Sequence, residues 1–180
     1  MAQSFIGRSD LPLGVRNNNP GNIRPGDAWQ GMTGENGGFI VFQDISWGLR
    51  ALATDIAHKI THGYNTITSM VTRYAPPSEN NTAAYIAAVS SDTGIPADQV
   101  LNQDAGTLHA LVRAIINHEN GDEASALISD QDINQGISMI SGSLLQLFNA
   151  AGIALQNPGT PGEVALILAG FALLWLAGRR

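Results

Sequence analysis

Hydrophobic residues recur at helical spacing through much of the first 120 residues, and the stretches that contain them are bounded by helix start and stop signals. The clearest stretch begins at Ser46, a potential cap, and continues to about His62. Its apolar face consists of Leu49, Leu52, Ala53, Ile56 and Ile60. Shorter patterns predict helices at about 66–74, 82–92 and 107–118, and a short helical turn at 97–101.

Residues 1–38 do not follow this period. They are rich in Gly, Asn and Pro, which favours loops over regular structure. Phe39 to Phe42 is the one strand candidate in this region, because its residues are β-branched or aromatic. We therefore predict a mainly α domain with a small lobe of loop and strand.

The last third of the chain is almost free of charge: between Ile133 and Gly178 the only ionisable side chain is Glu163. An uncharged amphipathic helix is predicted first, and the segment 157–162, Asn-Pro-Gly-Thr-Pro-Gly, then breaks it. The apolar run that follows has about 15 residues, or roughly 22 Å as a helix, which is short for a hydrocarbon core of about 30 Å. Trp175 and the terminal arginines are typical of a membrane interface.

The predicted organisation is a domain over 1–132, an amphipathic helix with linker over 133–157 and a C-terminal apolar helix over 158–180. The last two form either a helical hairpin or a membrane anchor, and a buried helix packed on the domain or in a larger assembly is the alternative. No N-terminal signal peptide is visible in Met1 to Asp10.

Composition removes several classes of function. The chain has no cysteine, which excludes disulfides, thiol nucleophiles and Cys-ligated metals. Its net charge of −6 does not suit a general nucleic-acid binder. His58 and His62 are four apart on a predicted helix, but the glutamate of a zinc-protease motif is missing, because Lys59 stands there. We expect neither a metal nor another cofactor.

Glu119 ends an apolar helix and precedes Asn120-Gly121. A carboxyl in the last turn lies near the negative end of the helix dipole, and partial burial adds desolvation. Both effects favour the protonated form, which a general acid requires. A solvated glutamate in a helix C-terminal turn is the alternative from chemistry alone.

Two loops are dense in amide side chains, which donate and accept hydrogen bonds and so suit sugar hydroxyl and N-acetyl groups. The first is Arg16-Asn17-Asn18-Asn19-Pro20-Gly21-Asn22-Ile23-Arg24, and the second is Pro76-Pro77-Ser78-Glu79-Asn80-Asn81-Thr82. Ordinary turn chemistry, with Ser78 or Asn81 as a helix cap, is the alternative.

The chain resembles a family of bacteriophage peptidoglycan-degrading domains similar to lysozymes and lytic transglycosylases. The resemblance covers about residues 14–121 and is carried by the segments 16–24, 38–42, 48–51, 74–86 and 115–121. The stretch Ala114-Ile-Ile-Asn-His-Glu119-Asn-Gly121 is similar to the catalytic helix of lytic transglycosylases. In those enzymes that helix precedes the substrate loop, whereas here the Asn-rich loop comes first, so a permuted arrangement is expected.

The resemblance implies a lysozyme-like (α+β) fold and cleavage of the glycan between N-acetylmuramic acid and N-acetylglucosamine. It implies Glu119 as the catalytic acid, with Glu79 as a second carboxyl or the rival. The residues expected to bind glycan are Arg16, Asn17, Asn18, Asn19, Asn22, Arg24, Asn80 and Tyr85. Trp29 is a further candidate for stacking on a sugar.

The expected partners are peptidoglycan strands, other virion proteins and, through the C-terminal helix, a lipid bilayer. A virion-associated, membrane-anchored enzyme that acts during delivery of the phage genome fits these features. Two alternatives stay open: a structural virion protein that has lost catalysis, and a membrane-anchored endolysin that acts in host lysis.

Overall fold

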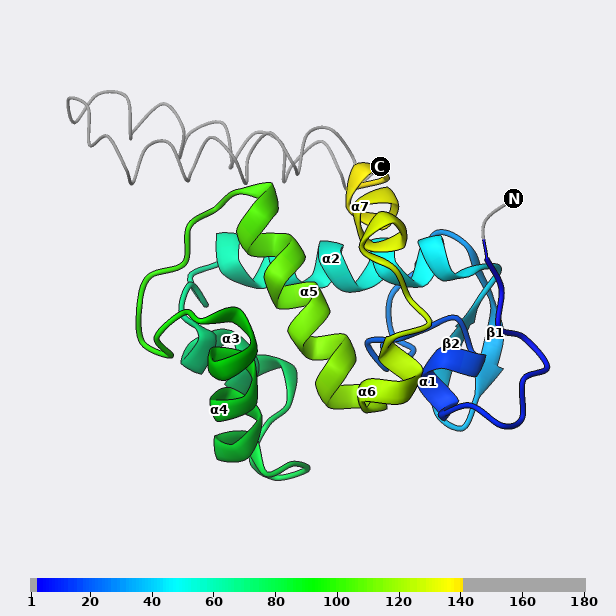
Figure 1. Cartoon of the computed structure of the whole chain (residues 1–180), viewed down its shortest axis with the longest axis horizontal. Coiled ribbons are helices and arrows are strands. Elements are labelled where there is room, and N and C mark those ends of the chain that lie inside the picture. Colours follow the sequence, from blue (N-terminus) through cyan, green and yellow to red (C-terminus); the bar gives the residue numbers. More distant parts are fainter. Residues whose placement is uncertain (1–2, 141–180) are drawn as a thin grey trace.

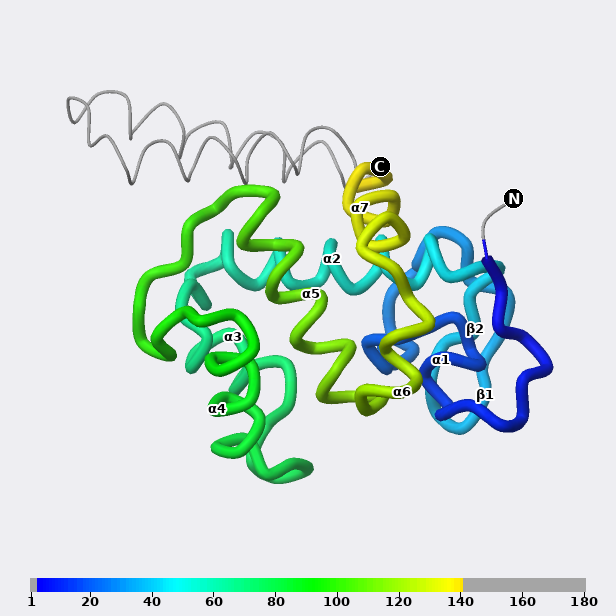
Figure 2. Tube along the Cα trace, in the orientation of Figure 1, coloured from blue at the N-terminus to red at the C-terminus, as the bar shows by residue number. Residues whose placement is uncertain are grey.

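The computed structural model describes residues 3–140, which form a mainly helical domain with one small sheet, as the hydrophobic pattern predicts (Figure 1). The helices are α1 (Leu13–Arg16), α2 (Ile45–Thr61), α3 (Ile67–Tyr74), α4 (Thr82–Thr93), α5 (Ala105–Asn120), α6 (Asp122–Ser125) and α7 (Asp130–Ser138). The strands β1 (Met32–Asn36) and β2 (Phe39–Phe42) form an antiparallel hairpin. The trace shows α3 and α4 on one side of the crossing helices α2 and α5, and the N-terminal lobe on the other (Figure 2).

The expected helices form because each begins at a side chain that caps its free N–H groups. Thr66 and Ser69 make a reciprocal capping box for α3, and Asn81 caps α4. The cap of α2 is Asp44 rather than Ser46: the Asp44 carboxylate accepts hydrogen bonds from both the backbone N–H and the hydroxyl of Ser46. A carboxylate at this position also interacts favourably with the positive end of the helix dipole.

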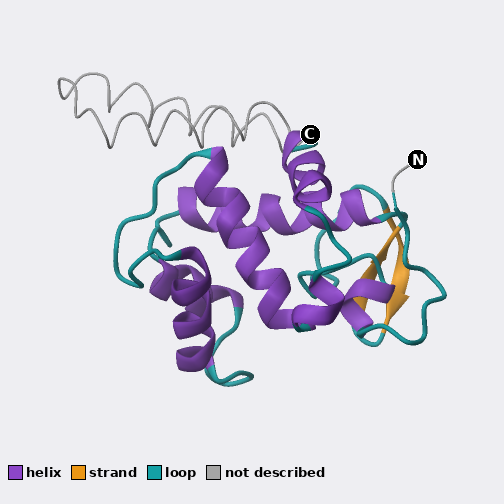
Figure 3. Cartoon of the chain, viewed as in Figure 1, coloured by secondary structure: helices purple, strands orange, loops and turns teal. Residues whose placement is uncertain are grey.

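Helix α2 lies at the centre of the core. Its predicted apolar face is fully buried, together with residues of α3, α5 and α7. A second, smaller apolar cluster joins the hairpin to α2 through Ile23, Ile40, Phe42 and Ala51. The two clusters place the loop-rich lobe against one end of α2 (Figure 3).

Three local expectations are corrected. The segment expected to be loop contains strand β1. This strand is the exposed hairpin partner of β2, so its sequence, MTGEN, shows no alternation of hydrophobic and polar residues. Helix α1 was also missed, since one turn carries too few residues for a period. Residues 97–101 do not form a helix; they form a turn that buries Leu101, whose N–H donates to the carbonyl oxygen of Asn65.

Helix α7 crosses the expected domain boundary between residues 132 and 133. Ile133, Ile137 and Ile140 belong to the main core. Gly136 lies so close to α2 that a Cβ there would be 2.5 Å from the Cβ of Leu49. The core domain therefore continues through residue 140, and the rest of the predicted linker and the apolar helix over 158–180 lie outside the described residues. Within residues 3–140, every helix is too short or too polar to cross a bilayer.

Candidate active site

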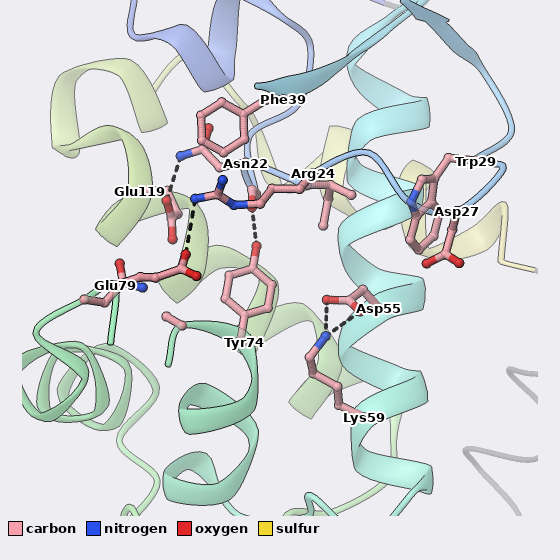
Figure 4. Close-up of a pocket in the computed structure, with 14 residues that line it drawn as sticks. Asn22, Arg24, Asp27, Trp29, Phe39, Asp55, Lys59, Tyr74, Glu79 and Glu119 are labelled. Carbon is pink, nitrogen blue, oxygen red and sulfur yellow. Dashed lines mark hydrogen bonds and ion pairs between the residues drawn. The ribbon is translucent and has the colours of Figure 1, made fainter. Parts of the chain in front are cut away.

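A cavity of about 290 Å³ opens where the N-terminal lobe, α2, the α3–α4 turn and the end of α5 meet (Figure 4). Its wall contains four carboxyls, two basic side chains, two amides and three aromatic rings. The lining residues are Gly21, Asn22, Ile23, Arg24, Asp27, Trp29, Phe39, Asp55, Lys59, Tyr74, Ala75, Glu79, Asn80 and Glu119.

Glu119 lies in the last turn of α5 and is half-buried. Its Oε2 accepts a hydrogen bond from Nδ2 of Asn22 at 2.7 Å, and its Oε1 accepts one from the hydroxyl of Tyr85 at 2.8 Å. The helix stops beside it because Gly121 adopts a φ of +73°, which glycine reaches without steric cost. Both carboxyl oxygens are thus fixed by neutral donors on different elements, which orients the group toward the cavity.

Asn22 reaches Glu119 from a loop almost a hundred residues earlier in the sequence, and the backbone around it is tightly fitted. Its φ of +51° is left-handed, a region that asparagine tolerates better than most residues. The next residue of α5, Asn120, also bonds this loop, because its Nδ2 donates to the carbonyl oxygen of Pro20 at 2.7 Å. A Cβ on Gly14 would lie 2.6 Å from Oδ1 of Asn22 and 2.7 Å from Oδ1 of Asn120, so any other residue there would displace both amides.

Tyr85 is 2% exposed and lies behind Glu119, where it cannot stack on a sugar. Its ring stacks on His118 with centroids 3.6 Å apart and meets Tyr74 edge-on at 6.4 Å. Burial raises the pKa of the Tyr85 and Tyr74 hydroxyls far above the ordinary value, so both stay protonated and donate. The Tyr74 hydroxyl donates to the carbonyl oxygen of Gly21. The prediction of Tyr85 as a glycan ligand is corrected: the residue positions Glu119.

Two of the other carboxyls in the cavity are ion-paired. Glu79 pairs with Arg24 at 3.4 Å, and both side chains are exposed. Asp55 pairs with Lys59, whose Nζ lies 2.5 and 2.6 Å from the two carboxylate oxygens. The fourth, Asp27, is exposed on the loop that also carries Trp29. Sequence reasoning missed the Asp55–Lys59 pair; the i,i+4 spacing signals an ion pair on a helix, but not that the pair faces a cavity.

The three consecutive asparagines do not line this cavity, and their predicted contact with glycan is corrected. All three are buried, with Asn17 the most exposed at 2%. Asn18 donates to the carbonyl oxygen of Phe42, Asn19 donates to that of Ile40, and Asn17 bonds the last residue of β1. Their amides tie the loop to the hairpin, because buried backbone groups there have no sheet partner and need one.

The structure therefore divides the predicted site. Glu119, Glu79, Asn22, Arg24 and Asn80 line one cavity, as does Trp29, whereas Asn17, Asn18, Asn19 and Tyr85 are buried around it. Arg16 lies in a different cavity, on the N-terminal lobe. Within residues 3–140 no group of three or more metal-ligating side chains lies close enough to hold an ion, and His58 and His62 stack on each other with centroids 3.9 Å apart.

These features define a class: a mainly helical domain with a half-buried glutamate at the end of a core helix, facing a polar cavity. No family model matches the chain. The chain is 36% identical over 120 residues to Protein P5 of Pseudoalteromonas phage PM2, an overlap of 63% of this chain and 74% of that protein. The chain belongs to the same family as this phage protein, so the predicted relationship to bacteriophage proteins is confirmed.

Proposed function

We propose that this protein cleaves the glycan backbone of peptidoglycan, with Glu119 as the catalytic acid. The observation that supports this most directly is the setting of Glu119 in the cavity. It is half-buried and is held by two neutral donors, whereas Glu79 and Asp55 each bond a cation. Of these three carboxyls, Glu119 is the one that no cation occupies, so it is free to be presented to the glycosidic oxygen of a bound glycan.

In the proposed reaction Glu119 protonates the oxygen of the β-1,4 bond between N-acetylmuramic acid and N-acetylglucosamine, and that bond breaks. Glu119, now ionised, then takes the proton from the 6-hydroxyl of the muramic sugar, whose oxygen attacks the anomeric carbon. The product is a 1,6-anhydro end, and the glutamate regains its proton. Ordinary glycoside hydrolysis uses a second carboxyl, either as the base that activates water or as the nucleophile. Glu79 and Asp55 are ion-paired, and the remaining carboxyl, Asp27, lies on the opposite side of the cavity from Glu119 (Figure 4), which favours the scheme with one acid.

The other groups in the cavity suit a sugar ligand. Asn22 and Asn80 offer amide donors and acceptors, and Trp29 and Phe39 offer apolar faces. The Arg24–Glu79 pair joins the two amide-rich loops across the cavity (Figure 4). An exposed pair of this kind stabilises by about 0–1 kcal/mol, so a glycan strand that separates the two side chains meets little resistance.

The phage relative supports a role in the viral life cycle, and we place the enzyme in the virion, where it opens the cell wall locally during genome delivery. The apolar segment 158–180 is proposed as its lipid anchor. Liposome flotation tests the anchor: the full chain should float with the vesicles, and a chain ending at residue 157 should stay at the bottom. Equal behaviour of the two chains would exclude a lipid anchor in that segment.

The enzymatic proposal is tested with purified peptidoglycan and two matched variants. Glu119→Gln should lower the rate of muropeptide release by about 10²–10⁴-fold, the usual contribution of a general acid. Glu79→Gln removes a carboxyl from the same cavity and should retain most of the activity. Mass analysis of the products should show anhydro ends, which lack one water relative to hydrolysis products. An active Glu119→Gln variant, or an inactive wild-type protein, would refute the proposal.

A further inference from the structure

A second cavity, of about 480 Å³, lies on the N-terminal lobe, and Arg16 is the one charged residue that lines it. Ser9, Asn36 and Val41 are among its other lining residues. It adjoins the candidate active site along β2. Phe39 lines the active-site cavity, and Val41 lines the second cavity. The two residues are two positions apart in β2, so their side chains share the outer face of the strand. At about 3.4 Å per residue, they are roughly 7 Å apart.

Arg16 is half-buried as a residue, and its guanidinium makes no hydrogen bond or ion pair with any residue from 3 to 140. Its Nε is shielded from solvent and has no acceptor. The adjacent amides of Asn17 and Asn36 bond each other instead, since Nδ2 of Asn36 donates to Oδ1 of Asn17 at 2.9 Å. A partly desolvated cation without a counter-charge is costly, and an anionic ligand would remove that cost.

Most other described cations already have a carboxylate. Arg8, Arg24, Lys59 and Arg113 are each within 3.4 Å of an acidic oxygen. In a chain with a net charge of −6, a cation that lines a cavity without an acid beside it is therefore unusual.

We propose that this second cavity binds a carboxylate and that, in function, the carboxylate belongs to a peptide branching from the glycan in the adjacent active site. The guanidinium fork matches a carboxylate with two parallel N–H···O bonds. The peptides of peptidoglycan end in free carboxylates, and the short distance along β2 lets one molecule occupy both cavities. The choice of this ligand rests on the proposed function, whereas the anion site itself does not.

The test uses two forms of one tetrasaccharide muropeptide: the natural form, and a form whose peptide carboxylates are amidated. Calorimetry on the full chain measures both, with Glu119→Gln present throughout so that neither probe is consumed. Amidation should weaken binding about tenfold or more. In an added Arg16→Gln variant both forms should bind equally. Arg73→Gln removes the same charge elsewhere and should keep the full effect of amidation.

The remaining outcomes separate the site from the enzyme. Equal binding of both forms without the Arg16 change, or the same loss in Arg73→Gln as in Arg16→Gln, overturns the anion site. If neither form binds, the proposed glycan function fails. The free stem tetrapeptide then tests the anion site at Arg16 separately. It should shift the NMR signal of the Arg16 Nε–H group, and its amidated form should not. An unmoved signal with both peptides overturns the site as well.

Discussion

The substitution Gly14→Ala tests whether close packing of α1 positions the carboxyl of Glu119, the proposed catalytic acid. An alanine Cβ would lie 2.6 Å from Oδ1 of Asn22 and 2.7 Å from Oδ1 of Asn120, and a normal carbon–oxygen contact is longer by roughly 0.6 Å. Both amides must therefore move, and the Asn22 amide is the group that holds Oε2 of Glu119. Overpacking of this kind costs about 1–3 kcal/mol. A shift of up to about 1 Å in a catalytic group lowers the rate by up to about 10²-fold.

The measurements are the thermal midpoint and the rate of muropeptide release. Gly14→Ala should lower the midpoint by about 3–10 °C and the rate by tens of fold at a temperature where the variant is folded. Gly106→Ala is the matched control, because a Cβ there meets nothing closer than 3.4 Å and alanine favours the α5 helix. It should keep full activity with equal or higher stability. Wild-type stability and activity in Gly14→Ala would show that this contact does not position the acid.

Three further outcomes are expected. Gly48→Ala should cost about 3 kcal/mol or more in a urea titration, because its Cβ would lie 1.8 Å from the backbone oxygen of Asn18, which cannot rotate away; an unchanged midpoint would contradict this packing. Tyr85→Phe should lower the rate of the proposed wall cleavage about tenfold with little change in the thermal midpoint, because it removes one hydrogen bond to the carboxyl of Glu119 and keeps the buried ring. Wild-type rates in this variant would argue against a positioning role for Tyr85. Hydrogen bonding to Arg113 lowers the pKa of Asp130 below 3.8. The stability that this carboxylate contributes is therefore present above pH 3.8 and is lost as the pH falls through the lowered pKa. Asp130→Asn should flatten this part of the plot of stability against pH, and a plot identical to that of the wild type would refute the linkage.

The candidate site shows why a residue type can be found more easily than its role. Glu119 is recognisable because an apolar helix, a carboxyl and a glycine stop occur in order. The role of the asparagines at 17–19 is not recognisable, because the same amide groups can bind a sugar or an unpaired backbone carbonyl equally well. Burial separates the two roles, and burial depends on the distant strand β2.

Contacts between residues that are distant in the sequence are even more difficult to predict from the sequence than the role of a single residue. Asp55 and Lys59 read as a common surface ion pair on a helix, and nothing local reveals that the N-terminal loop folds over them to form a cavity. The contact between Asn22 and Glu119 likewise joins residues far apart in the chain. The expected meeting of the Asn-rich loop with Glu119 holds for Asn22, while its neighbours turn inward.

The sequence by itself determined most of the helices, because a 3.6-residue apolar period and a capping side chain act within one or two turns of backbone. It also determined that a glutamate ends a core helix. The tertiary structure alone decided which polar side chains face the cavity and which form hydrogen bonds with the backbone instead. That choice depends on which buried carbonyls and amides lack a partner after the hairpin, the loop and α5 have packed together, and no local pattern encodes it.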